Sequence, residues 1–577
     1  MTPREDREFL PHGRQLAVTW SIPDAAGGMT GAMLRRSRSF VRLAGAEVDV
    51  LTFDARTDYP AVRERLEARG ELVPGLRIRN LYEELRGDPA DAGPGTVVTQ
   101  EVARGLRVEH RRADGSLAVL DEQPRNDGER RRITAFDREE RPVRRWESAW
   151  ACYADWIADV AGDGPAFAIV DSKTAARFMA RVHLPEVVTL HVVHNAHLSG
   201  RGRPLGPLRA SRRDALSRPE RFDAVVFLTE RQRADVVTLL GDGGNLAVVP
   251  NATPAPIDPA APEPTADDAT RDPASVVVVA GLTGRKRVHH AVEAVALARE
   301  DGVPATLRIF GSGPERARLD AAVHDRGLGE VVEFAGHRTD AAEAFAEASV
   351  TLLTSTSEGA PLVLLEAMSR GCVPIVYDIP YGPADLIEHG VDGFLVAPGD
   401  VRALADAVRH VAELPETDRA RLREAARAAA ARFGDAEVVA RWGEVQRRAA
   451  VRHRAVPLPA FEAARLRLRR PGDRLRLSAR LDGVPDGAGV LVRLERRASG
   501  VLLRRRAELR RGRVELRLTP EETAFLGEGS LHVGFVVLDG DRRAEVAAGR
   551  VHPDTRPLPR RVTAGVRSRL GRARRRG

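Results

Sequence analysis

The sequence predicts an α/β protein with two doubly wound domains, an antiparallel β-meander inserted into the first and an all-β domain after the second. Three observations support this fold class. Short apolar segments of strand length alternate with helical stretches on both sides of a proline-rich segment. Strictly alternating segments with Gly and Asp turns interrupt this rhythm once and follow it once. The length of 577 residues is too great for one domain.

The first domain is predicted to span residues 12–251 and begins in the way a parallel sheet does. A buried strand at residues 16–20 is followed by the turn Gly27-Gly28 and then by a helical stretch. Strand, helix and strand in this order begin a doubly wound sheet. The other elements are expected as a helix at 30–42 and strands at 47–53, 168–170, 187–193, 224–228 and 246–249.

An insertion is predicted at residues 96–145, where short alternating segments replace the α/β rhythm. The turn signals Asp114-Gly115 and Asn126-Asp127-Gly128 separate these segments. Alternation of polar and apolar residues is typical of an antiparallel sheet with one covered face. We therefore expect a β-meander that belongs to the first domain.

A proline-rich linker, residues 252–273, is predicted to join the first domain to the second. The second α/β domain is expected over residues 274–450 and includes an alanine- and arginine-rich helix over residues 402–433. Its strands are expected at 276–280, 307–310, 331–335, 350–353, 374–377 and 393–396.

An accessory all-β domain is predicted over residues 466–551, because segments such as 474–481 alternate strictly and Gly and Asp turns recur. A basic tail, residues 552–577, follows this domain and ends in a cluster of arginines. Two interpretations of the tail stay open. It is either a solvated chain end or a segment that contacts an anionic surface.

The composition limits the classes of protein and partner. Hydrophobic residues make up 43% of the chain, which argues against global disorder, and the net charge of +8 favours anionic partners such as nucleotides, phosphate polymers or acidic lipids. Cys152 and Cys372 lie far apart and fit a reducing compartment. The chain starts with charged residues and contains no apolar stretch near the roughly 20 residues that span a bilayer. We expect a cytoplasmic protein, at most peripheral to the inner face of a membrane.

Residues 357–368, Ser-Glu-Gly-Ala-Pro-Leu-Val-Leu-Leu-Glu-Ala-Met, are the most informative segment for function. They open an apolar helix, whose free N–H groups and positive dipole end suit a diphosphate. Gly359 permits close approach of the backbone. Glu358 and Glu366 can face one cleft, where carboxylates accept hydrogen bonds from sugar hydroxyls. Taken alone, the two glutamates also fit a helix-capping acid and an exposed helical residue.

This segment resembles the motif of the retaining glycosyltransferases of family four, in which two glutamates are separated by seven residues in the setting E-G-x-P-L-x-x-L-E-A-M. The resemblance covers residues 275–445 and includes the segments 309–315, 371–376, 381–383 and 387–396. It implies the GT-B fold, with two facing Rossmann-like domains. It also implies transfer of a hexosyl unit from a nucleotide diphosphate sugar with retention of the anomeric configuration.

The resemblance implies roles for individual residues. Glu366 would hold the ribose of the nucleotide, and Glu358 would hold a hydroxyl of the donor sugar. Backbone N–H groups around Gly359, Ala360, Pro361 and Leu362 would hold the diphosphate and sugar. His337 and Arg338 would flank the nucleobase, and Gly311 is expected at the nucleotide.

One position departs from the family pattern. The family places an arginine after the first strand of this domain and a lysine five residues later, and both clamp the diphosphate. Lys286 fits the lysine position, but the arginine position falls on Gly281. Arg285 or Arg287 could supply the missing charge; otherwise leaving-group stabilisation is weakened. The three consecutive basic residues also fit a plain surface turn.

In the first domain, the turn Gly27-Gly28 resembles the family's glycine loop, which reaches across the cleft to the donor phosphates. His194 corresponds to the family's active-site histidine, which contacts the donor sugar. A metal site formed by His191, His194 and His197 is disfavoured, because no acidic or Cys ligand lies nearby in sequence. We expect no metal and no cofactor other than the UDP-sugar or other nucleotide-sugar substrate.

A narrower resemblance joins the meander to the segment His194-Asn195-Ala196-His197-Leu198. Together they resemble the teichoic-acid α-glycosyltransferases and the bacterial glycosyltransferases that modify serine-rich adhesins. This resemblance implies transfer of glucose or N-acetylglucosamine to a cell-envelope acceptor, such as a polyol-phosphate polymer. It also implies that the meander binds acceptor or forms a homo-oligomer.

Three alternatives stay open from the sequence. The same fold could act on a lipid-linked sugar, a capsular glycan or a protein. The chain could be a degenerate transferase that binds donor without turnover, which the glycine at position 281 motivates. It could also be a non-catalytic protein that binds nucleic acid or another anionic polymer through its β domain and tail. This alternative is disfavoured because it leaves the glutamate motif unexplained.

Overall fold

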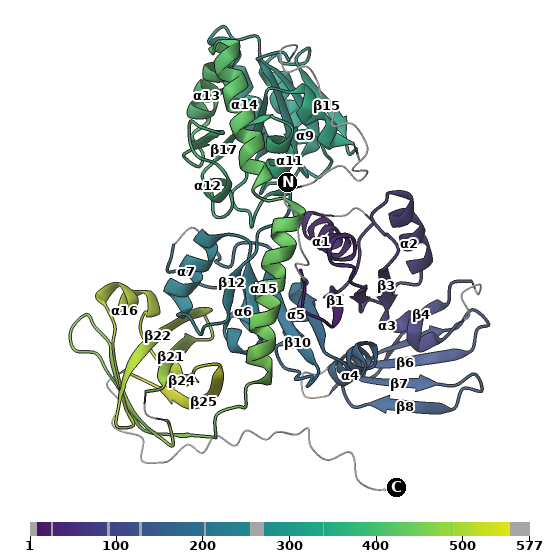
Figure 1. Cartoon of the computed structure of the whole chain (residues 1–577), viewed down its shortest axis with the longest axis vertical. Helices are drawn as coiled ribbons and strands as arrows, with labels where there is room; N and C mark the ends of the chain where they lie inside the picture. The colour runs from purple at the N-terminus through teal and green to yellow at the C-terminus, as the bar shows by residue number, and fades with distance from the viewer. Residues whose placement is uncertain are drawn as a thin grey trace, which may run out of the picture.

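The computed structural model describes residues 9–24, 27–88, 93–125, 130–200, 203–253, 271–338, 340–485 and 487–553. Two α/β lobes lie one above the other, and each side of the N-terminal lobe carries an antiparallel sheet (Figure 1). Most of the predicted linker and of the basic tail lies outside the described residues. Among the described residues, no helix combines the length and apolarity that crossing a bilayer requires.

The N-terminal lobe is built on a parallel sheet of seven strands in the order β12-β11-β10-β9-β1-β2-β3. Its strands are nearly continuous apolar runs, since helices cover both faces of the sheet. The strand order reverses at β1, which pairs with both β2 and β9, and ligands of such sheets bind at this switch point. The strands are β1 (Arg14–Val18), β2 (Val48–Thr52), β3 (Leu76–Asn80), β9 (Ala166–Val170), β10 (Val187–Val193), β11 (Ala224–Phe227) and β12 (Leu246–Val248).

The helices of this lobe start and end at recognisable signals. Ser148, Ser172 and Thr229 accept hydrogen bonds from backbone N–H groups in the first turns of α4, α5 and α7. The helices are α1 (Gly28–Ala44), α2 (Tyr59–Ala68), α3 (Leu81–Arg86), α4 (Ala149–Ala161), α5 (Lys173–Met179), α6 (Ala210–Leu216) and α7 (Glu230–Leu240).

The inserted meander is a five-stranded antiparallel sheet between α3 and α4, with its strands in sequential order. Val119, Ile133 and Ala135 are buried on the face that packs against these helices, and Tyr82 of α3 stacks on His110 of the same face at 4.1 Å between ring centroids. The sheet thus has the one covered face that alternation predicts. Its strands are β4 (Thr96–Val102), β5 (Gly105–Arg111), β6 (Leu117–Pro124), β7 (Arg132–Phe136) and β8 (Pro142–Trp146).

The C-terminal lobe is a parallel sheet of six strands in the order β15-β14-β13-β16-β17-β18. Its strands are β13 (Ser275–Val279), β14 (Thr306–Phe310), β15 (Val332–Gly336), β16 (Val350–Leu353), β17 (Val373–Tyr377) and β18 (Phe394–Val396). Its helices are α8 (Val288–Glu300), α9 (Arg316–Asp325), α10 (Ala344–Glu347), α11 (Leu362–Ser369), α12 (Pro383–Leu386), α13 (Val401–Glu413) and α14 (Glu416–Ala431). The single helix expected over residues 402–433 is two helices, because Leu414 before Pro415 takes an extended conformation.

Helix α15 (Asp435–Arg454) follows the C-terminal lobe in sequence but packs on the N-terminal lobe, along the front of its sheet in Figure 1. Val438, Val439 and Trp442 join the core of that lobe beside Phe40 of α1. The polar contacts that hold the helix there include the ion pair Arg35–Asp435 at 2.8 Å and the buried amide pair of Gln15 and Gln446. The chain thus passes from the C-terminal lobe back to the N-terminal lobe at the start of α15, and this passage connects the two lobes.

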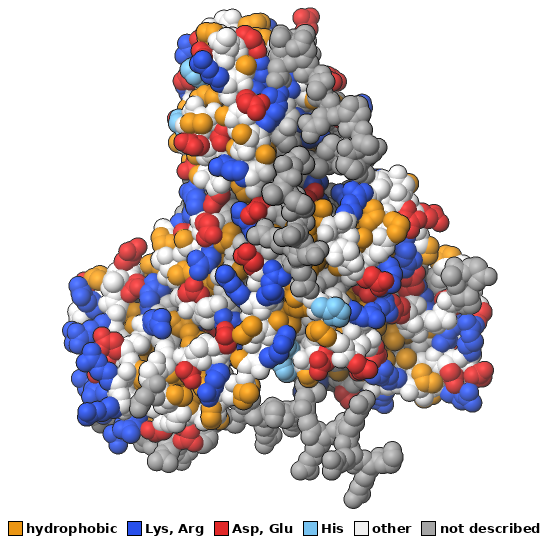
Figure 2. Space-filling model, viewed as in Figure 1, with side chains coloured by type: hydrophobic (Ala, Val, Ile, Leu, Met, Phe, Trp, Pro, Cys, Tyr) orange, Lys and Arg blue, Asp and Glu red, His pale blue; other side chains and the backbone are white. Residues whose placement is uncertain are grey.

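The C-terminal β domain is an antiparallel sheet in the order β19-β20-β23-β22-β21-β24-β25, curled until it nearly closes. It packs on α7, and its core is continuous with that of the N-terminal lobe. Figure 2 shows arginine side chains, drawn in blue, gathered along the outer edge of this domain. Its elements are β19 (Glu462–Arg469), β20 (Arg476–Asp482), β21 (Gly489–Arg496), β22 (Val501–Arg510), β23 (Arg513–Arg517), α16 (Pro520–Leu526), β24 (Leu531–Asp539) and β25 (Arg542–Val551).

Candidate active site

The two lobes touch where the loop after β10 meets the loop before α11. A Cβ atom on Gly359 would lie 1.9 Å from the carbonyl oxygen of His194, so only glycine allows this approach. Asn251 donates a hydrogen bond from Nδ2 to the carbonyl oxygen of Ala360 at 3.3 Å. The two segments that the sequence singles out, one in each lobe, are therefore neighbours across the cleft.

Glu358 is a buried carboxylate that pairs with Lys286 and with the exposed Arg285. Its Oε1 lies 2.7 Å from Lys286 Nζ and 2.7 Å from Arg285 Nη1, while its side chain is 9% exposed. Burial raises the pKa of the Glu358 carboxyl, but attraction to Lys286 and Arg285 outweighs burial and holds that pKa below its usual value. Lys286 is one of only two lysines in the chain. The carboxylate is thus ionised and held by two cations.

Glu366 lies two turns further along, half-buried on α11. Burial raises the pKa of its carboxyl, and the charges of Arg370 and of Arg35 in the other lobe oppose this rise. No side chain caps the N-terminus of α11, which leaves its first N–H groups free for an anion. Glu358, the helix N-terminus around Ala360, Pro361 and Leu362, and Glu366 follow one another along one stretch of chain.

His194 belongs to a buried polar chain that sequence reasoning missed. Its Nε2 lies 2.7 Å from Asp171 Oδ1, and Arg36 of α1 donates two hydrogen bonds, of 2.9 and 2.7 Å, to the same carboxylate. Burial raises the pKa of Asp171, but Arg36 and the hydrogen bond from His194 bring it down to about 2. Asp171 directly follows β9, a position where cleft residues collect, whereas Arg36 gives no signal in the sequence.

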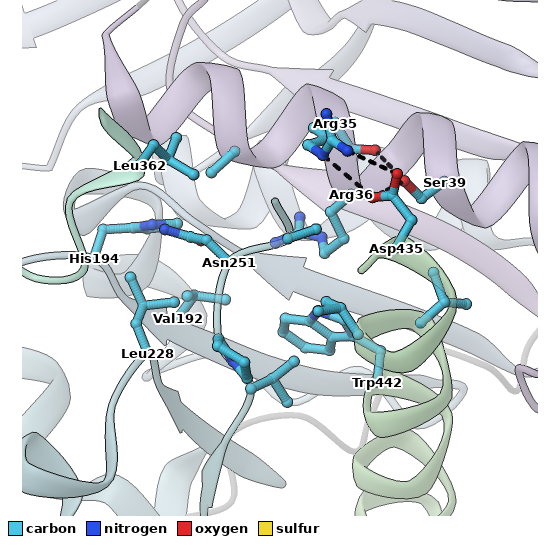
Figure 3. Close-up of a pocket in the computed structure, with 16 residues that line it drawn as sticks. Arg35, Arg36, Ser39, Val192, His194, Leu228, Asn251, Leu362, Asp435 and Trp442 are labelled. Atoms are coloured by element: carbon cyan, nitrogen blue, oxygen red, sulfur yellow. Dashed lines mark hydrogen bonds and ion pairs between the residues drawn. The ribbon is translucent and has the colours of Figure 1, made fainter. Parts of the chain in front are cut away.

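Figure 3 shows His194 at one end of a narrow pocket, with Arg35 and Arg36 of α1, Leu362 of α11 and Asp435 of α15 around it. Arg35 and Ser39 hold Asp435 with hydrogen bonds of 2.8 and 2.9 Å. The histidine therefore sits where both lobes and the crossing helix meet.

The other two histidines of the segment do not converge with His194. His191 is buried on β10, hydrogen-bonded to the carbonyl oxygen of Val170, and it stacks on Phe222. His197 stacks on Tyr381 with 5.7 Å between ring centroids. In the part of the chain that the structure describes, no three His, Cys, Asp or Glu side chains gather as metal ligands do.

The loops after β13 and β14 run side by side. Gly311 has a φ of +142°, and a Cβ atom there would lie 1.9 Å from the carbonyl oxygen of Ala280. Gly281 instead faces open space, with no atom within 4 Å of a Cβ placed on it. The space beside Gly281, where the family carries arginine, is therefore open. Arg285 instead forms an ion pair with Glu358.

Four other predicted residues lie at the exposed ends of elements. Gly27 is the N-cap of α1 and Gly28 its first residue, and a Cβ atom added to either would have no described atom within 4 Å. His337 and Arg338 follow β15 and are exposed, and Arg338 forms an ion pair with Asp340. No contact joins these four residues to Glu358 or His194 among the interactions of the described residues.

A second cavity, of about 290 Å³, lies between the lobes beside Ser357. Arg203 and Arg209 of the N-terminal lobe and Arg287 of the C-terminal lobe line it. Arg203 pairs with Asp235 at 2.6 Å, whereas Arg209 hydrogen-bonds only neutral oxygens, of Leu198 and Ser357. Arg287 starts α8 and has no ion pair with a described residue. Arg209 and Arg287 thus bring to the cavity cationic charge that no carboxylate of the described residues compensates.

Parts of this chain are similar in sequence to known proteins. Residues 266–429 match the family described as glycosyl transferases group 1. An exopolysaccharide phosphotransferase of Streptomyces coelicolor is 37% identical over 40% of this chain and 24% of its own length. A poly(glycerol-phosphate) alpha-glucosyltransferase of Bacillus subtilis is 27% identical over 43% of this chain and 36% of its own length. The chain therefore spans well under two thirds of either relative.

Solved structures are similar over most of the chain. TarM of S. aureus superposes with a TM-score of 0.61 at 16% identity, covering 76% of this chain and all of TarM. The pneumococcal O-GlcNAc transferase GtfA, in complex with UDP and GlcNAc, gives a TM-score of 0.58 at 16% identity, covering 76% of this chain and 99% of GtfA. These similarities confirm the predicted fold, two facing Rossmann-like lobes with an inserted meander and an added β domain. Residues 266–429 form a group 1 glycosyltransferase domain, and the chain has the GT-B fold.

Proposed function

We propose that this protein is a retaining glycosyltransferase that moves glucose or N-acetylglucosamine from a nucleotide diphosphate sugar to a phosphate-bearing polymer of the cell envelope. The observation that carries the proposal is the buried carboxylate of Glu358, paired with Lys286 and Arg285 beside the uncapped N-terminus of α11. A carboxylate for sugar hydroxyls and cations for a leaving diphosphate are what this transfer requires. The names of two relatives add support, since one refers to an exopolysaccharide and the other to poly(glycerol phosphate).

The arrangement suggests how the donor is held. Lys286 and Arg285 share one oxygen of Glu358, so one cation can turn toward a diphosphate while the other still compensates the buried carboxylate. Glu366 would accept hydrogen bonds from the ribose, and the free N–H groups of α11 would contact the phosphates. Asp171 fixes the ring of His194, which would contact the donor sugar.

The reaction breaks the bond between the anomeric carbon and the oxygen of the β-phosphate, and it forms a bond from that carbon to an acceptor hydroxyl on the same face. The acceptor proton passes to the departing phosphate oxygen. We assign no carboxylate as a nucleophile, in contrast to retaining glycosidases. The residues would act by orientation and by electrostatic stabilisation of the leaving diphosphate, without a metal or a further cofactor.

The arginine-lined cavity suggests an anionic acceptor. Arg209 and Arg287 come from different lobes, and neither is compensated by a carboxylate of the described residues. A phosphate group bound between them would stabilise the closed arrangement of the lobes. We include in the proposal that the protein works at the cytoplasmic face of the membrane and that the meander, whose Val98 and Val102 are exposed, mediates self-association.

The stereochemical part of the proposal can be tested on the product. The protein is incubated with an α-linked UDP-sugar and a short polyol-phosphate acceptor, and the anomeric coupling constant of the product is read by proton NMR. We expect the α configuration. A β-linked product would overturn the retaining mechanism and leave the transfer itself intact.

The second candidate is a protein that binds the donor without turnover, and Gly281 motivates it. If Arg285 replaces the family's arginine, Arg285→Ala lowers kcat/KM by about tenfold or more, and adding Gly281→Arg, which meets open space, restores part of the loss. Donor binding by the wild type with no turnover for any acceptor would favour the non-catalytic candidate.

A further inference from the structure

The C-terminal β domain carries arginines that face one another across three strands. Arg469 of β19 lies directly opposite Arg476 of β20, which lies directly opposite Arg517 of β23. All three side chains are exposed. Like charges placed directly opposite each other destabilise a sheet, so this row is unfavourable for the isolated protein.

The row is part of a larger basic surface. Arg467 lies two residues before Arg469 on the same face, and Arg480 lies opposite Arg513, which lies opposite Arg510. Arg480, Arg510 and Arg513 have acidic partners on their own strands, at 2.8, 3.4 and 3.0 Å. Arg467, Arg469, Arg476 and Arg517 have no ion pair with any described residue. We name these four residues the arginine face.

The inward side chains fix which way the arginines point. Leu468, Leu477 and Leu516 alternate with them and are buried in the core of the domain. A slip of one residue would bring arginines into that core, so the register that aligns the row is strongly specified. The arginine face is therefore a stable feature of the folded domain.

The domain that bears this face is attached to the N-terminal lobe. Arg504 of β22 forms a buried ion pair with Glu220, and a Cβ atom on Gly241, at the end of α7, would lie 2.9 Å from Leu491 of β21. The strands that carry the arginine face lie on the other half of the sheet. Whatever binds this face is consequently attached to the lobe that carries Asp171 and His194.

We infer that the arginine face binds the phosphate groups of the polymer acceptor at a distance from the cleft, an inference that rests on the proposed function. Neighbouring strands lie about 4.8 Å apart, and alternate residues of one strand are about 7 Å apart. Such an array suits a chain with a charge on every repeat better than one small anion. Holding the polymer here raises the concentration of its free end at the cleft.

An acidic membrane has the same charge, but the surface fits it less well. Segments that insert into a membrane interface combine basic residues with apolar side chains that enter the lipid. None of the large apolar side chains exposed in the described part of the chain lies on β19, β20 or β23. We therefore assign the face to the polymer and use membrane binding as an opposing outcome of the test.

The test compares two triple variants of the full chain. The first, Arg469→Gln, Arg476→Gln and Arg517→Gln, removes the row; the control, Arg480→Gln, Arg510→Gln and Arg513→Gln, removes three arginines of the same sheet that have acidic partners. Binding of a long poly(glycerol phosphate) is measured by calorimetry at several salt concentrations. We expect the row variant to bind about tenfold or more weaker, with a salt slope smaller by roughly two to three, and the control to change less.

Three further readouts separate the possibilities. For a one-repeat acceptor, kcat and KM should stay unchanged in the row variant, because the cleft is intact. Unchanged affinity of the row variant for the long polymer would overturn the inference. The inference would also be overturned if the row variant lost its binding to vesicles containing phosphatidylglycerol but kept its affinity for the polymer. Polymer binding is measured without turnover, so a failure of the proposed transferase activity would be seen separately, as absence of product in the wild type.

Discussion

In the cleft between the lobes, the largely buried cations of Arg36 and Lys286 each contact a carboxylate, whereas on the C-terminal β domain the exposed Arg469, Arg476 and Arg517 have no ion pair with a described residue. Burial explains the difference. A charge removed from water must be compensated locally, while an exposed guanidinium keeps its hydration and is screened by salt. The first region can therefore position reacting groups, and the second is suited to multivalent binding that salt weakens.

Removing a buried partner should have the largest effect. Asp171→Ala leaves Arg36 buried without its carboxylate, and we expect the free energy of unfolding to fall by about 3–5 kcal/mol. The control is Asp482→Ala, which removes the partner of the exposed Arg480 and should cost at most about 1 kcal/mol. Urea unfolding of both variants measures the difference. Equal losses would show that Arg36 does not depend on Asp171.

Removing a cation from the cleft should mainly affect turnover. We expect Lys286→Ala to lower kcat about 10²- to 10³-fold, because one stabilising group for the leaving diphosphate is lost. Lys173→Ala removes the only other lysine, which is exposed on α5, and should leave kcat unchanged. Steady-state kinetics with saturating donor compares the two. A similar kcat for both variants would remove Lys286 from the mechanism.

The half-buried carboxylate of Glu366 predicts a pH dependence of donor binding. Burial raises its pKa above the usual value of 4.5, so lowering the pH from 7 toward that raised pKa protonates the carboxyl and removes its capacity to accept two hydrogen bonds. Donor affinity should therefore weaken several-fold toward acid in the wild type. Glu366→Gln should bind more weakly at pH 7 and show a flatter profile in calorimetry. Parallel profiles would assign the titration to another group.

The smallest effect is expected on the arginine face itself. Arg476→Gln removes the middle charge of the row, and relief of repulsion should leave the unfolding free energy unchanged or raise it by a few tenths of a kcal/mol. Thermal unfolding at low salt is the sensitive measurement. A clear loss of stability would show that Arg476 has a structural role, and the contrast between the two regions would then fail.

The sequence predicts best what depends on neighbouring residues. Apolar runs between glycine turns mark the parallel strands, and strict alternation marks both antiparallel sheets. The motif around Glu358 and Glu366 identifies the domain, since its spacing and its place before a helix are local properties. Even so, the break between α13 and α14 at Pro415 is local and was not expected, because the alanine-rich composition on both sides favours one helix.

Interactions between distant segments could not be predicted in this way. The return of α15 to the N-terminal lobe depends on Trp442 meeting Phe40 and Asp435 meeting Arg35, about four hundred residues away in sequence. The pairing of Arg36 with Asp171 likewise needs the folded sheet. Alternation shows that the arginines of β19, β20 and β23 share a face, but only the register places Arg469, Arg476 and Arg517 in one row.

The most direct test of the account is a screen of UDP- and GDP-sugars for thermal stabilisation and slow hydrolysis, with wild type and Glu366→Ala side by side. We predict that one donor raises the Tm of the wild type and is hydrolysed, and that the variant loses both effects. The absence of stabilisation by every sugar nucleotide, or equal stabilisation of both proteins, would contradict the assignment of the cleft as a donor site.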